Sequence, residues 1–490
     1  MKTFNKILVW FNRDLRVEDN TALKKAIIKG NQVFCTYIFD NNDLRNLKLE
    51  DKKNKKISFI YGCLEDLNNN LNNLGGNIFV NSDDNLEKKL IKIVKELSID
   101  AVFVNYDYEP YFIKLSTSLN KSLKEIGCEF ESFKDLVIFE KSDILTLSSK
   151  PFSVFTPYKN AWLKKIKETD LRFYENNSSK SFLKQNKTKI SYYDSIFPNL
   201  KSLGFDHSDL KFYDIETGSE GGEKQLKKFL NQIHKYHITR DFPNINGTSY
   251  LSVHIRYGTL SIRKLVSKAL ELSEKFEGAK IWLSELIWRE FYKMILFHNP
   301  HVMTRSFKKE FDLIEWEEGQ LAQNAFDAWC NGRTGFPFVD AGMKQLNTTG
   351  FMHNRLRMVT SSFLIKDLGI DWRLGEKYFS KKLFDYDLSA NNGGWQWAAS
   401  TGCDAQPYFR IFNPITQSQK FDQKGEFIKK YLPELINLND KQIHSPWNVN
   451  QKDLLYAGIM LDKNYPKPIV DHNEARKKTL KRYSKIKKTS

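Results

Sequence analysis

The feature that most restricts the fold of this chain is a set of four short apolar runs, at residues 7–11, 33–39, 77–80 and 101–104. Uninterrupted runs of this length are typical of parallel strands that are buried on both faces. Helical patterns lie between them, for example at residues 57–74 and 86–97. The alternation predicts a doubly wound α/β domain, in which ligands usually bind at the carboxyl ends of the strands.

The pattern changes after residue 130. Residues 175–204 are rich in Asn, Ser and Lys, and from Gly221 onward strand-like runs almost vanish. Seven of the ten tryptophans fall between Trp282 and Trp397, and residues 476–490 carry eight Lys or Arg and no acid. We therefore expect a Rossmann-like α/β domain over 1–130, a connector over 131–220, an all-α domain over 221–475 and a solvated basic tail over 476–490.

Charge and cysteine usage limit the class of protein. The net charge of +17, from 76 Lys and Arg against 59 Asp and Glu, favours polyanionic partners such as nucleic acid or an acidic membrane surface. The five cysteines are scattered and form no CxxC pair, which argues against a disulfide framework or a metal site. No secretory apolar core and no run of 18 uncharged apolar residues occurs, so we expect a cytoplasmic protein that does not span a membrane.

The familiar nucleotide-binding signatures are absent. No GxGxxG follows the first strand, and there is no GxxxxGK[ST]. Instead, Thr248 and Ser249 stand in a flexible stretch, 247–252, at an expected helix start. Hydroxyls and free N–H groups in such a place suit a pyrophosphate. An ordinary capped turn is the alternative.

Residues 282–292, WLSELIWREFY, predict a helix with Trp282, Glu285, Trp288, Arg289 and Tyr292 on one face. Two indoles with a carboxyl group between them suit the wall of a ligand pocket. A structural Glu–Arg pair on an amphipathic helix is the competing interpretation.

Two later segments carry further polar groups. Helical spacing over 351–358 places Asn354, Arg357 and Met358 on one face and leaves Arg355 free to meet a phosphate. In the second segment, 385–397, Asn391 and Trp395 share a face. Its paired glycines, at 393 and 394, weaken a helix and so indicate close approach of a flat ligand.

These segments together resemble the photolyase and cryptochrome family, and most closely its class I cyclobutane pyrimidine dimer photolyases. The resemblance runs from VWFNRDLR at 9–16 to YPKPIVDH at 465–472. It is most specific over 236–261, 282–292 and 333–435, which include WQWAASTG at 395–402 and YFRIFNP at 408–414. Under this resemblance, residues 1–130 form the antenna domain and residues 221–475 the FAD-binding and catalytic domain.

The resemblance implies that the helical domain binds FAD. The residues expected to hold its phosphate region are Tyr236, Thr248, Ser249, Leu251 and Ser252. Those expected around the rest of the cofactor are Trp282, Arg289, Asn354, Arg357, Asp385, Asp387 and Asn391, with Asn391 beside flavin N5. An amide suits that place because it can both donate and accept a hydrogen bond. A relay of Trp395, Trp372 and Trp316 is expected to feed electrons to the photoexcited flavin.

The resemblance also implies a substrate, a cyclobutane dimer flipped out of ultraviolet-damaged DNA and split by electron transfer from reduced FAD. The dimer pocket is expected to comprise Glu285, Trp288, Asn354, Met358 and Trp397. Glu285, Asn354, Met358 and Asn391 are the expected catalytic residues. Arg240, Arg355 and Arg410 are expected to bind the flanking phosphates. A monomer without an obligate protein partner is implied.

Related activities are the alternatives. The (6-4) photolyases carry histidines where Asn354 and Met358 stand, and plant-type cryptochromes usually carry an acid where Asn391 stands. A cryptochrome-like blue-light sensor and a (6-4) photolyase are thus the runners-up, while a flavoprotein that works without light leaves the tryptophan relay unexplained. Folate-using photolyases carry Asn-Glu shortly after a Tyr-Glu pair, but here Tyr108 and Glu109 precede Pro-Tyr-Phe. This departure argues against a folate antenna and leaves a deazaflavin, or no antenna, open.

Overall fold

The computed structural model describes residues 4–173, 197–210 and 215–487. Residues 174–196 and 211–214 of the predicted connector, and 488–490 of the predicted tail, lie outside this range. The chain divides into two compact units. Unit 1 comprises Met1–Lys150, Lys159–His234 and Ser249–Glu290, and unit 2 comprises Pro151–Tyr158, Lys235–Thr248 and Phe291–Ser490. This division rests on contacts within the fold. The domain boundaries inferred from the sequence therefore remain a prediction.

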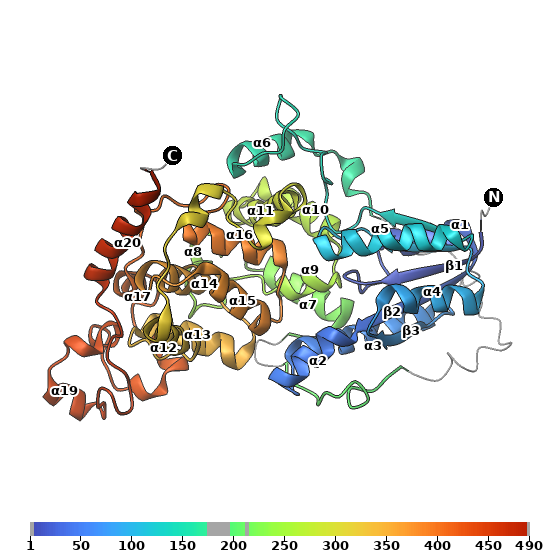
Figure 1. Cartoon of the computed structure of the whole chain (residues 1–490). Coiled ribbons are helices and arrows are strands. Elements are labelled where there is room, and N and C mark those ends of the chain that lie inside the picture. Colours follow the sequence, from blue (N-terminus) through green and yellow to red (C-terminus); the bar gives the residue numbers. More distant parts are fainter. Residues whose placement is uncertain (1–3, 174–196, 211–214, 488–490) are drawn as a thin grey trace. The chain divides into compact units, whose positions relative to one another are not determined.

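Unit 1 is built on a five-stranded parallel sheet (Figure 1). Its strands are β1 (Phe4–Phe11), β2 (Gly30–Asp40), β3 (Ile78–Asp83), β4 (Ala101–Asn105) and β5 (Glu129–Phe133). Their order across the sheet is β3-β2-β1-β4-β5, so the direction of winding reverses between β1 and β4. The four apolar runs of the sequence fall on β1 to β4, one run to each strand, and the predicted doubly wound α/β fold is confirmed.

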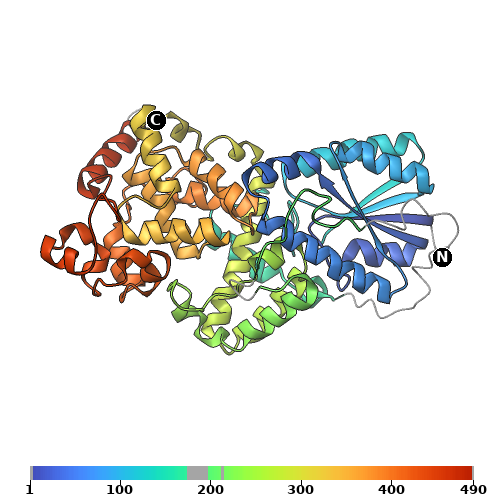
Figure 2. The same ribbon diagram turned by 90° about the horizontal axis from the view of Figure 1, so that it is seen from below.

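Helices cover both faces of this sheet (Figure 2). They are α1 (Thr21–Lys29), α2 (Asn41–Glu50), α3 (Lys55–Asn73), α4 (Leu86–Leu97) and α5 (Pro110–Glu125). Leu8 and Trp10 pack with α4 and α5 on one face. Their neighbour Ile7 points to the other face, where it lies beside Gly30 at the end of α1. The alternation along β1 is the period of two expected of a strand buried on both sides.

Three further helices complete unit 1: α7 (Gly218–Leu230), α9 (Ser252–Tyr257) and α10 (Ile262–Ser273). Gly258 ends α9 with a φ of +62°, and a Cβ there would lie 2.1 Å from the carbonyl oxygen of Arg13. Only glycine satisfies both the left-handed backbone and this close approach. The loop after β1 and the segment after α9 can therefore touch backbone to backbone. Two helices, α6 (Phe155–Lys165) and α11 (Glu277–His298), carry the chain from one unit into the other.

Unit 2 is helical in its described residues, as the loss of strand-like runs predicts. Its helices are α8 (Tyr236–Thr239), α12 (Gly319–Cys330), α13 (Pro337–Thr349), α14 (Asn354–Ser362), α15 (Trp372–Lys382), α16 (Leu388–Ala399), α17 (Pro414–Phe421), α18 (Glu426–Tyr431), α19 (Gln451–Tyr456) and α20 (His472–Lys487). A π-helical turn, η6 (Phe363–Asp367), continues α14. The core of unit 2 centres on Trp329, whose ring stacks on Phe379 with centroids 6.0 Å apart.

The C-terminal basic segment packs on unit 2, where Tyr483 and Ile486 form a separate small apolar cluster with Ile314. Helix α20 buries Ala475, Thr479, Tyr483 and Ile486, at intervals of three and four residues. The Tyr483 hydroxyl donates to the carbonyl oxygen of Ala399 at 2.7 Å. The expectation of a solvated tail is therefore wrong for residues 476–487, because one face of the segment is apolar and packed. None of the helices in the described ranges is long and apolar enough to cross a bilayer.

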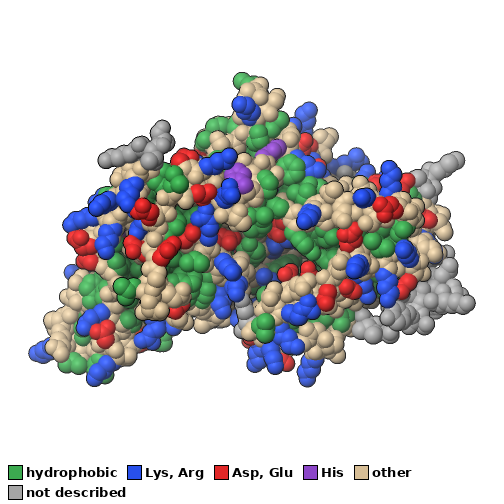
Figure 3. All heavy atoms as spheres, in the orientation of Figure 1, with side chains coloured by type: hydrophobic (Ala, Val, Ile, Leu, Met, Phe, Trp, Pro, Cys, Tyr) green, Lys and Arg blue, Asp and Glu red, His purple; other side chains and the backbone are tan. Residues whose placement is uncertain are grey.

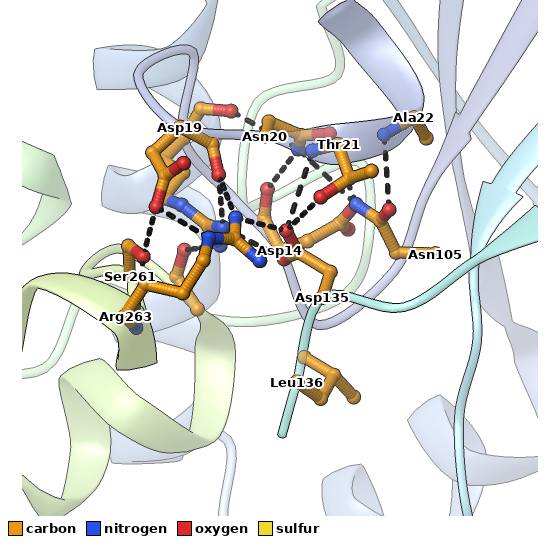
Figure 4. A network of polar contacts seen from close by, with 12 residues as sticks. Asp14, Asp19, Asn20, Thr21, Ala22, Asn105, Asp135, Leu136, Ser261 and Arg263 are labelled. Atoms are coloured by element: carbon orange, nitrogen blue, oxygen red, sulfur yellow. Dashed lines mark hydrogen bonds and ion pairs between the residues drawn. The ribbon is translucent and has the colours of Figure 1, made fainter. Parts of the chain in front are cut away.

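A buried ionic network joins the sheet of unit 1 to α10 (Figure 4). Asp135, which follows β5, binds Arg16 at 2.7 Å and Arg263 at 2.8 Å. It also accepts a hydrogen bond from the Thr21 hydroxyl at the start of α1, at 2.9 Å. Burial acts to raise the pKa of Asp135, but the two guanidinium groups outweigh it and hold the pKa below its ordinary value of 3.8. The carboxylate is thus ionised and ties four segments of the chain together.

We expect Asp135→Asn to lower the free energy of unfolding by about 3–5 kcal/mol, because it leaves two buried guanidinium groups without their counter-ion. The depressed pKa means that this contribution is present above a pH of about 4 and is lost as the pH falls through the folded pKa. Urea unfolding measured at pH 7 and over a series from about pH 4 down to about pH 2 checks both points. Lys268→Ala, which breaks an exposed pair with Glu271 in the same unit, is the control and should leave the midpoint unchanged. Equal effects of the two substitutions would contradict the prediction.

Candidate functional site

The predicted site residues occur in both units. Unit 1 holds Ser249, Leu251, Ser252, Trp282, Glu285, Trp288 and Arg289. Unit 2 holds Tyr236, Arg240, Thr248, Trp316, Asn354, Arg355, Arg357, Met358, Trp372, Asp385, Asp387, Asn391, Trp395, Trp397 and Arg410. Each unit therefore presents its own set of polar and aromatic groups.

In unit 1, the predicted helix over 282–292 is confirmed as part of α11. Trp282 is buried and packs edge-on against Phe229, with ring centroids 5.0 Å apart. Glu285 and Trp288 are partly exposed. Arg289 donates from its Nη1 to the carbonyl oxygen of Leu136 at 2.7 Å. On the face predicted to line a pocket, Trp282 is therefore anchored in the core, whereas Glu285 and Trp288 are more accessible.

Glu290 holds this helix in place. Its carboxyl group accepts hydrogen bonds from the backbone N–H groups of Ile138 and Phe139 and from the indole of Trp162 at 2.6 Å. Burial raises its pKa to about 7. Together with the bond from Arg289 to Leu136, these contacts fasten α11 to the segment that follows Asp135 and to Trp162 of α6.

The stretch expected to cradle a pyrophosphate has one unsatisfied donor. The Thr248 hydroxyl is buried and has no hydrogen-bond partner among the described residues. Ser249 is used locally, since its hydroxyl accepts from the N–H of Leu251 at 3.4 Å and its carbonyl accepts from Gln225 at 2.7 Å. Helix α9 begins at Ser252, as predicted, but has only six residues. A buried hydroxyl without a partner costs free energy unless a ligand satisfies it, and this fits a phosphate oxygen.

In unit 2, an ion pair joins the two segments with the most polar groups. Arg357 on α14 binds Asp385 at 2.8 Å, and its Nε donates to the carbonyl oxygen of Met352 at 2.8 Å. Asp385 is buried, whereas the Arg357 side chain is 29% exposed. The pair fixes the guanidinium plane while leaving part of its edge accessible to an acceptor.

Helix α14 begins where the ring of His353 caps it. Nδ1 of His353 accepts from the N–H of Arg355 at 3.1 Å, and burial lowers the pKa of this histidine to about 4. The ring is therefore neutral at neutral pH and can accept the hydrogen bond. The cap sets Asn354 and Met358 one turn apart, and the Asn354 amide lies 3.8 Å from the Met358 sulfur.

Asp387 has two structural tasks. It caps α16 by accepting from the N–H of Ala390 at 3.1 Å, and its other oxygen binds Lys293 at 2.7 Å. Lys293 is only 3% exposed, so this pair neutralises a buried cation. No sequence pattern indicated the role of Lys293, because it lies 94 positions from its partner along the chain.

Asn391 is held in one orientation by Glu376. Its amide nitrogen donates to Oε1 of Glu376 at 2.8 Å, and burial raises the pKa of that carboxyl. With the amide nitrogen engaged, the carbonyl oxygen is the group left to meet a ligand. Glu376 lies one turn of α15 after Trp372, and no spacing pattern in the sequence indicated its role.

The two glycines of α16 have different surroundings. A Cβ at Gly393 would lie 2.3 Å from the ring of Tyr292, so the close approach there is to the protein's own side chain. A Cβ at Gly394 would meet nothing within 4 Å. Of the two glycines, only Gly394 therefore leaves space for the predicted close approach of a flat ligand.

The three predicted relay tryptophans differ in burial. Trp395 is 2% exposed and packs edge-on against Phe379, with centroids 5.0 Å apart. Trp372 is 1% exposed. Trp316 is partly buried and meets Tyr483 of α20 edge-on at 6.5 Å. The series thus runs from two core residues to one that reaches the surface of unit 2.

Among the residues expected to bind DNA phosphates, one differs from expectation. Arg355 is not free, because it forms an ion pair with Asp241 at 2.8 Å and lies over the ring of Phe421 at 4.1 Å. Arg410 is exposed beside Phe409, and the guanidinium of Arg240 lies 5.2 Å from the ring of Tyr236. Figure 3 shows Lys and Arg side chains interspersed with acidic ones over the face in view.

Comparison with known proteins assigns the chain to a family. Residues 7–175 match the family described as "DNA photolyase", and residues 282–485 match "FAD binding domain of DNA photolyase". The chain is 40% identical over 491 residues to the deoxyribodipyrimidine photo-lyase of Escherichia coli K12, covering 98% of this chain and 99% of that relative. The fold and the matched FAD-binding domain define a flavoprotein. The chain belongs to the DNA photolyase family.

Solved structures agree with this assignment. A bacterial class III photolyase from Agrobacterium tumefaciens matches with a TM-score of 0.87 and 34% identity, covering 100% of this chain and 98% of that one. An archaeal photolyase from Sulfolobus tokodaii, solved with two FAD molecules, matches with a TM-score of 0.79 and 30% identity, covering 98% of this chain and 100% of that one.

We expect Thr248→Val to weaken FAD binding several-fold, since it removes a buried hydroxyl that has no protein partner, and one such hydrogen bond contributes about 1 kcal/mol. Release of FAD, followed by the rise of its fluorescence on dilution, measures the affinity. Thr360→Val is the control, because the Thr360 hydroxyl donates within its own helix to Leu356. An unchanged affinity in Thr248→Val would remove Thr248 from the phosphate site.

Proposed function

We propose that this protein is a deoxyribodipyrimidine photo-lyase, which uses light and FAD to split cyclobutane pyrimidine dimers in DNA. The observation that carries the proposal is the match along nearly the whole chain to photolyases, together with polar groups in unit 2 that suit a flavin. Reduced FAD, when bound, supplies the electron that light transfers to the dimer. Its class within the family stays a prediction, because the Agrobacterium neighbour is described as class III.

Several groups of this chain suit the cofactor. Thr248 offers an unpaired hydroxyl to a phosphate, and Arg357, oriented by Asp385, offers a guanidinium edge. Asn391 presents its carbonyl oxygen once Glu376 holds its amide nitrogen, which suits a ring N–H such as that at flavin N5. We assign to FAD, with these, Tyr236, Ser249, Leu251, Ser252, Trp282, Arg289, Asn354 and Asp387.

The dimer is assigned to Glu285, Trp288, Asn354, Met358 and Trp397. A damaged pair costs less to extrude from the duplex than an intact one. Indole faces can stack on the exposed pyrimidines, while the carboxyl group of Glu285 and the amide of Asn354 can hydrogen-bond their edges. The Asn354 amide nitrogen makes a weak contact with the Met358 sulfur at 3.8 Å, so a pyrimidine can replace this contact at little cost.

Phosphates on either side of the dimer are assigned to Arg240, Arg355 and Arg410. Arg410 is exposed and can bind a phosphate directly. Arg355 must either give up its ion pair with Asp241 or bind the phosphate while keeping that pair. Contacts of this kind add affinity that does not depend on sequence and falls with salt. We also propose that the protein is a cytoplasmic monomer without an obligate protein partner.

The antenna chromophore stays open. In unit 1, Tyr108 donates to Glu140 at 2.8 Å, and Glu109 binds Arg13 at 2.6 Å and Arg256 at 2.8 Å. These contacts occupy both side chains of the Tyr-Glu pair, and the argument against folate rests on the Pro-Tyr-Phe that follows it in the sequence. An absorption spectrum of the natively purified protein identifies any second chromophore by its own band beside that of the flavin.

The test of the proposed function is repair of ultraviolet-irradiated oligothymidine by the reduced protein, followed by the recovery of thymine absorbance. We expect recovery under blue light and none in the dark. No recovery in light, with FAD bound and photoreducible, would overturn dimer repair. Recovery at the same rate in the dark would overturn the light-driven mechanism.

Trp288→Ala should weaken binding of a dimer-containing oligonucleotide by about 1–3 kcal/mol, the usual loss when one stacking aromatic is removed. Binding of the undamaged oligonucleotide and the FAD content should not change. Electrophoretic mobility shifts with both oligonucleotides measure the difference. Equal weakening for damaged and undamaged DNA would place Trp288 outside the dimer pocket.

A further inference from the structure

The loop between α16 and α17, residues 400–413, carries the exposed Arg410 that is assigned to a DNA phosphate. Arg410 closes a tight turn, because its backbone N–H donates to the carbonyl oxygen of Pro407 at 3.0 Å. Tyr408 and Phe409 are the two central residues of this turn, and Phe409 is 60% exposed. The position of Tyr408 therefore decides where the backbone of Arg410 lies.

Tyr408 is held by the C-terminal helix of unit 2. Its ring stacks on that of Tyr483 in α20, with centroids 5.9 Å apart and an angle of 4° between the two ring planes. Tyr483 is 1% exposed and packs in an apolar cluster with Ile314 and Ile486. A stacked aromatic pair contributes both attraction and a preferred orientation of the two rings. The turn that ends at Arg410 is thus fixed against a buried ring of α20.

Tyr483 is itself fixed to the end of α16. Its hydroxyl donates to the carbonyl oxygen of Ala399 at 2.7 Å. The amine nitrogen of Lys366 lies 3.7 Å from the centroid of the Tyr483 ring and donates to the hydroxyl of Ser400 at 3.1 Å. Ala399 and Ser400 follow shortly after Trp397, at the point where the loop begins. One buried tyrosine therefore joins the start of the loop to the turn within it.

The other end of the loop is also anchored. The Phe412 ring lies near that of Trp397, with centroids 6.5 Å apart. The side chain of Asn413 caps α17 by accepting from the N–H of Ile415 at 2.9 Å. Arg410 thus stands between two supported aromatic residues, one packed on α20 and one beside the assigned dimer pocket.

Arg410 depends on this support more than Arg355 does. Arg355 is bound by Asp241 at 2.8 Å, whereas Arg410 forms no ion pair with any residue in the described ranges. Its place is therefore set by the loop backbone, and through the turn by Tyr408. Without the stack, the turn would have to be ordered when DNA binds, and this ordering costs free energy.

We propose that Tyr408 and Tyr483 are positioning residues for DNA binding, whose stacked rings fix the turn that presents Arg410 to a phosphate. The inference rests on the proposed function and adds two residues that the family resemblance did not assign. Helix α20, whose basic sequence predicted a solvated tail, thereby raises DNA affinity through its buried face. The stack acts by ordering the turn before DNA arrives, which lowers the cost of the phosphate contact.

The test compares binding of the holoprotein to a dimer-containing duplex and to an undamaged one over a salt series. In Tyr408→Leu we expect the affinity for both duplexes to fall about two- to tenfold, the range that corresponds to one aromatic pair. The slope of log affinity against log salt concentration should become shallower by up to about 0.9, the value for one phosphate contact. Light-driven repair by the reduced protein at saturating DNA should keep its rate, because neither tyrosine is assigned to the flavin or the dimer.

Three further variants serve as comparisons. Tyr408→Phe keeps the ring and should bind both duplexes as the unchanged protein does. Tyr483→Leu removes the other ring of the stack and should reproduce the effect of Tyr408→Leu. Tyr456→Leu removes a tyrosine that is 95% exposed on α19 of the same unit, and as the matched control it should change neither affinity nor slope. Loss of affinity in Tyr408→Phe equal to that in Tyr408→Leu would overturn the inference.

A double-substitution cycle separates positioning from a general loss of structure. Arg410→Gln should by itself weaken binding of both duplexes, and adding Tyr408→Leu to it should then cause little further loss. Additive losses, or a slower repair rate at saturating DNA in Tyr408→Leu, would overturn the positioning role alone. If Arg410→Gln changes neither affinity nor slope, the phosphate assignment of Arg410 fails and the inference fails with it. Light-driven repair by the unchanged protein tests the proposed function independently of these results.

Discussion

The ionised carboxylate of Asp135, buried between Arg16 and Arg263, is the interaction on which the rest of unit 1 depends. Its bonds join the loop after β1, the start of α1, the end of β5 and the start of α10. A parallel sheet alone does not determine where later helices pack on it. Here two guanidinium groups that cannot be left unpaired in the interior impose one arrangement. The segment that follows Asp135 then receives Arg289 and Glu290 of α11.

In unit 2, individual side-chain pairs hold polar groups in one orientation. Three polar residues assigned to the cofactor are each held by a second side chain: Asp385 orients Arg357, Lys293 binds Asp387, and Glu376 holds the amide of Asn391. Two of these partners lie on α11 and α15 and the third, Asp385, lies in the turn before α16, so the packing of these elements decides how the assigned groups point. Orientation of this kind lowers the cost of binding because the groups are already placed.

Arg373 shows how ion pairs hold the start of a helix in place. It pairs with Asp312 at 2.5 Å and with Asp371 at 3.2 Å, and its Nε donates to the carbonyl oxygen of Thr304 at 2.8 Å. The same contacts stabilise the start of α15, since Asp371 caps this helix.

The strands, the long helices and the helical face of 282–292 could be read from the sequence, because the period of apolar residues reports which side of an element is buried. The family, with the residues carried over from it, also followed from local motifs. Only the tertiary structure revealed Lys293, Glu376 and Arg373, whose partners are distant in sequence or unrelated to a helical face. It also showed that Arg355 is paired with Asp241 and that residues 476–487 pack as a helix. A local pattern determines an element and its buried side, but the partner of a buried charge depends on which elements meet.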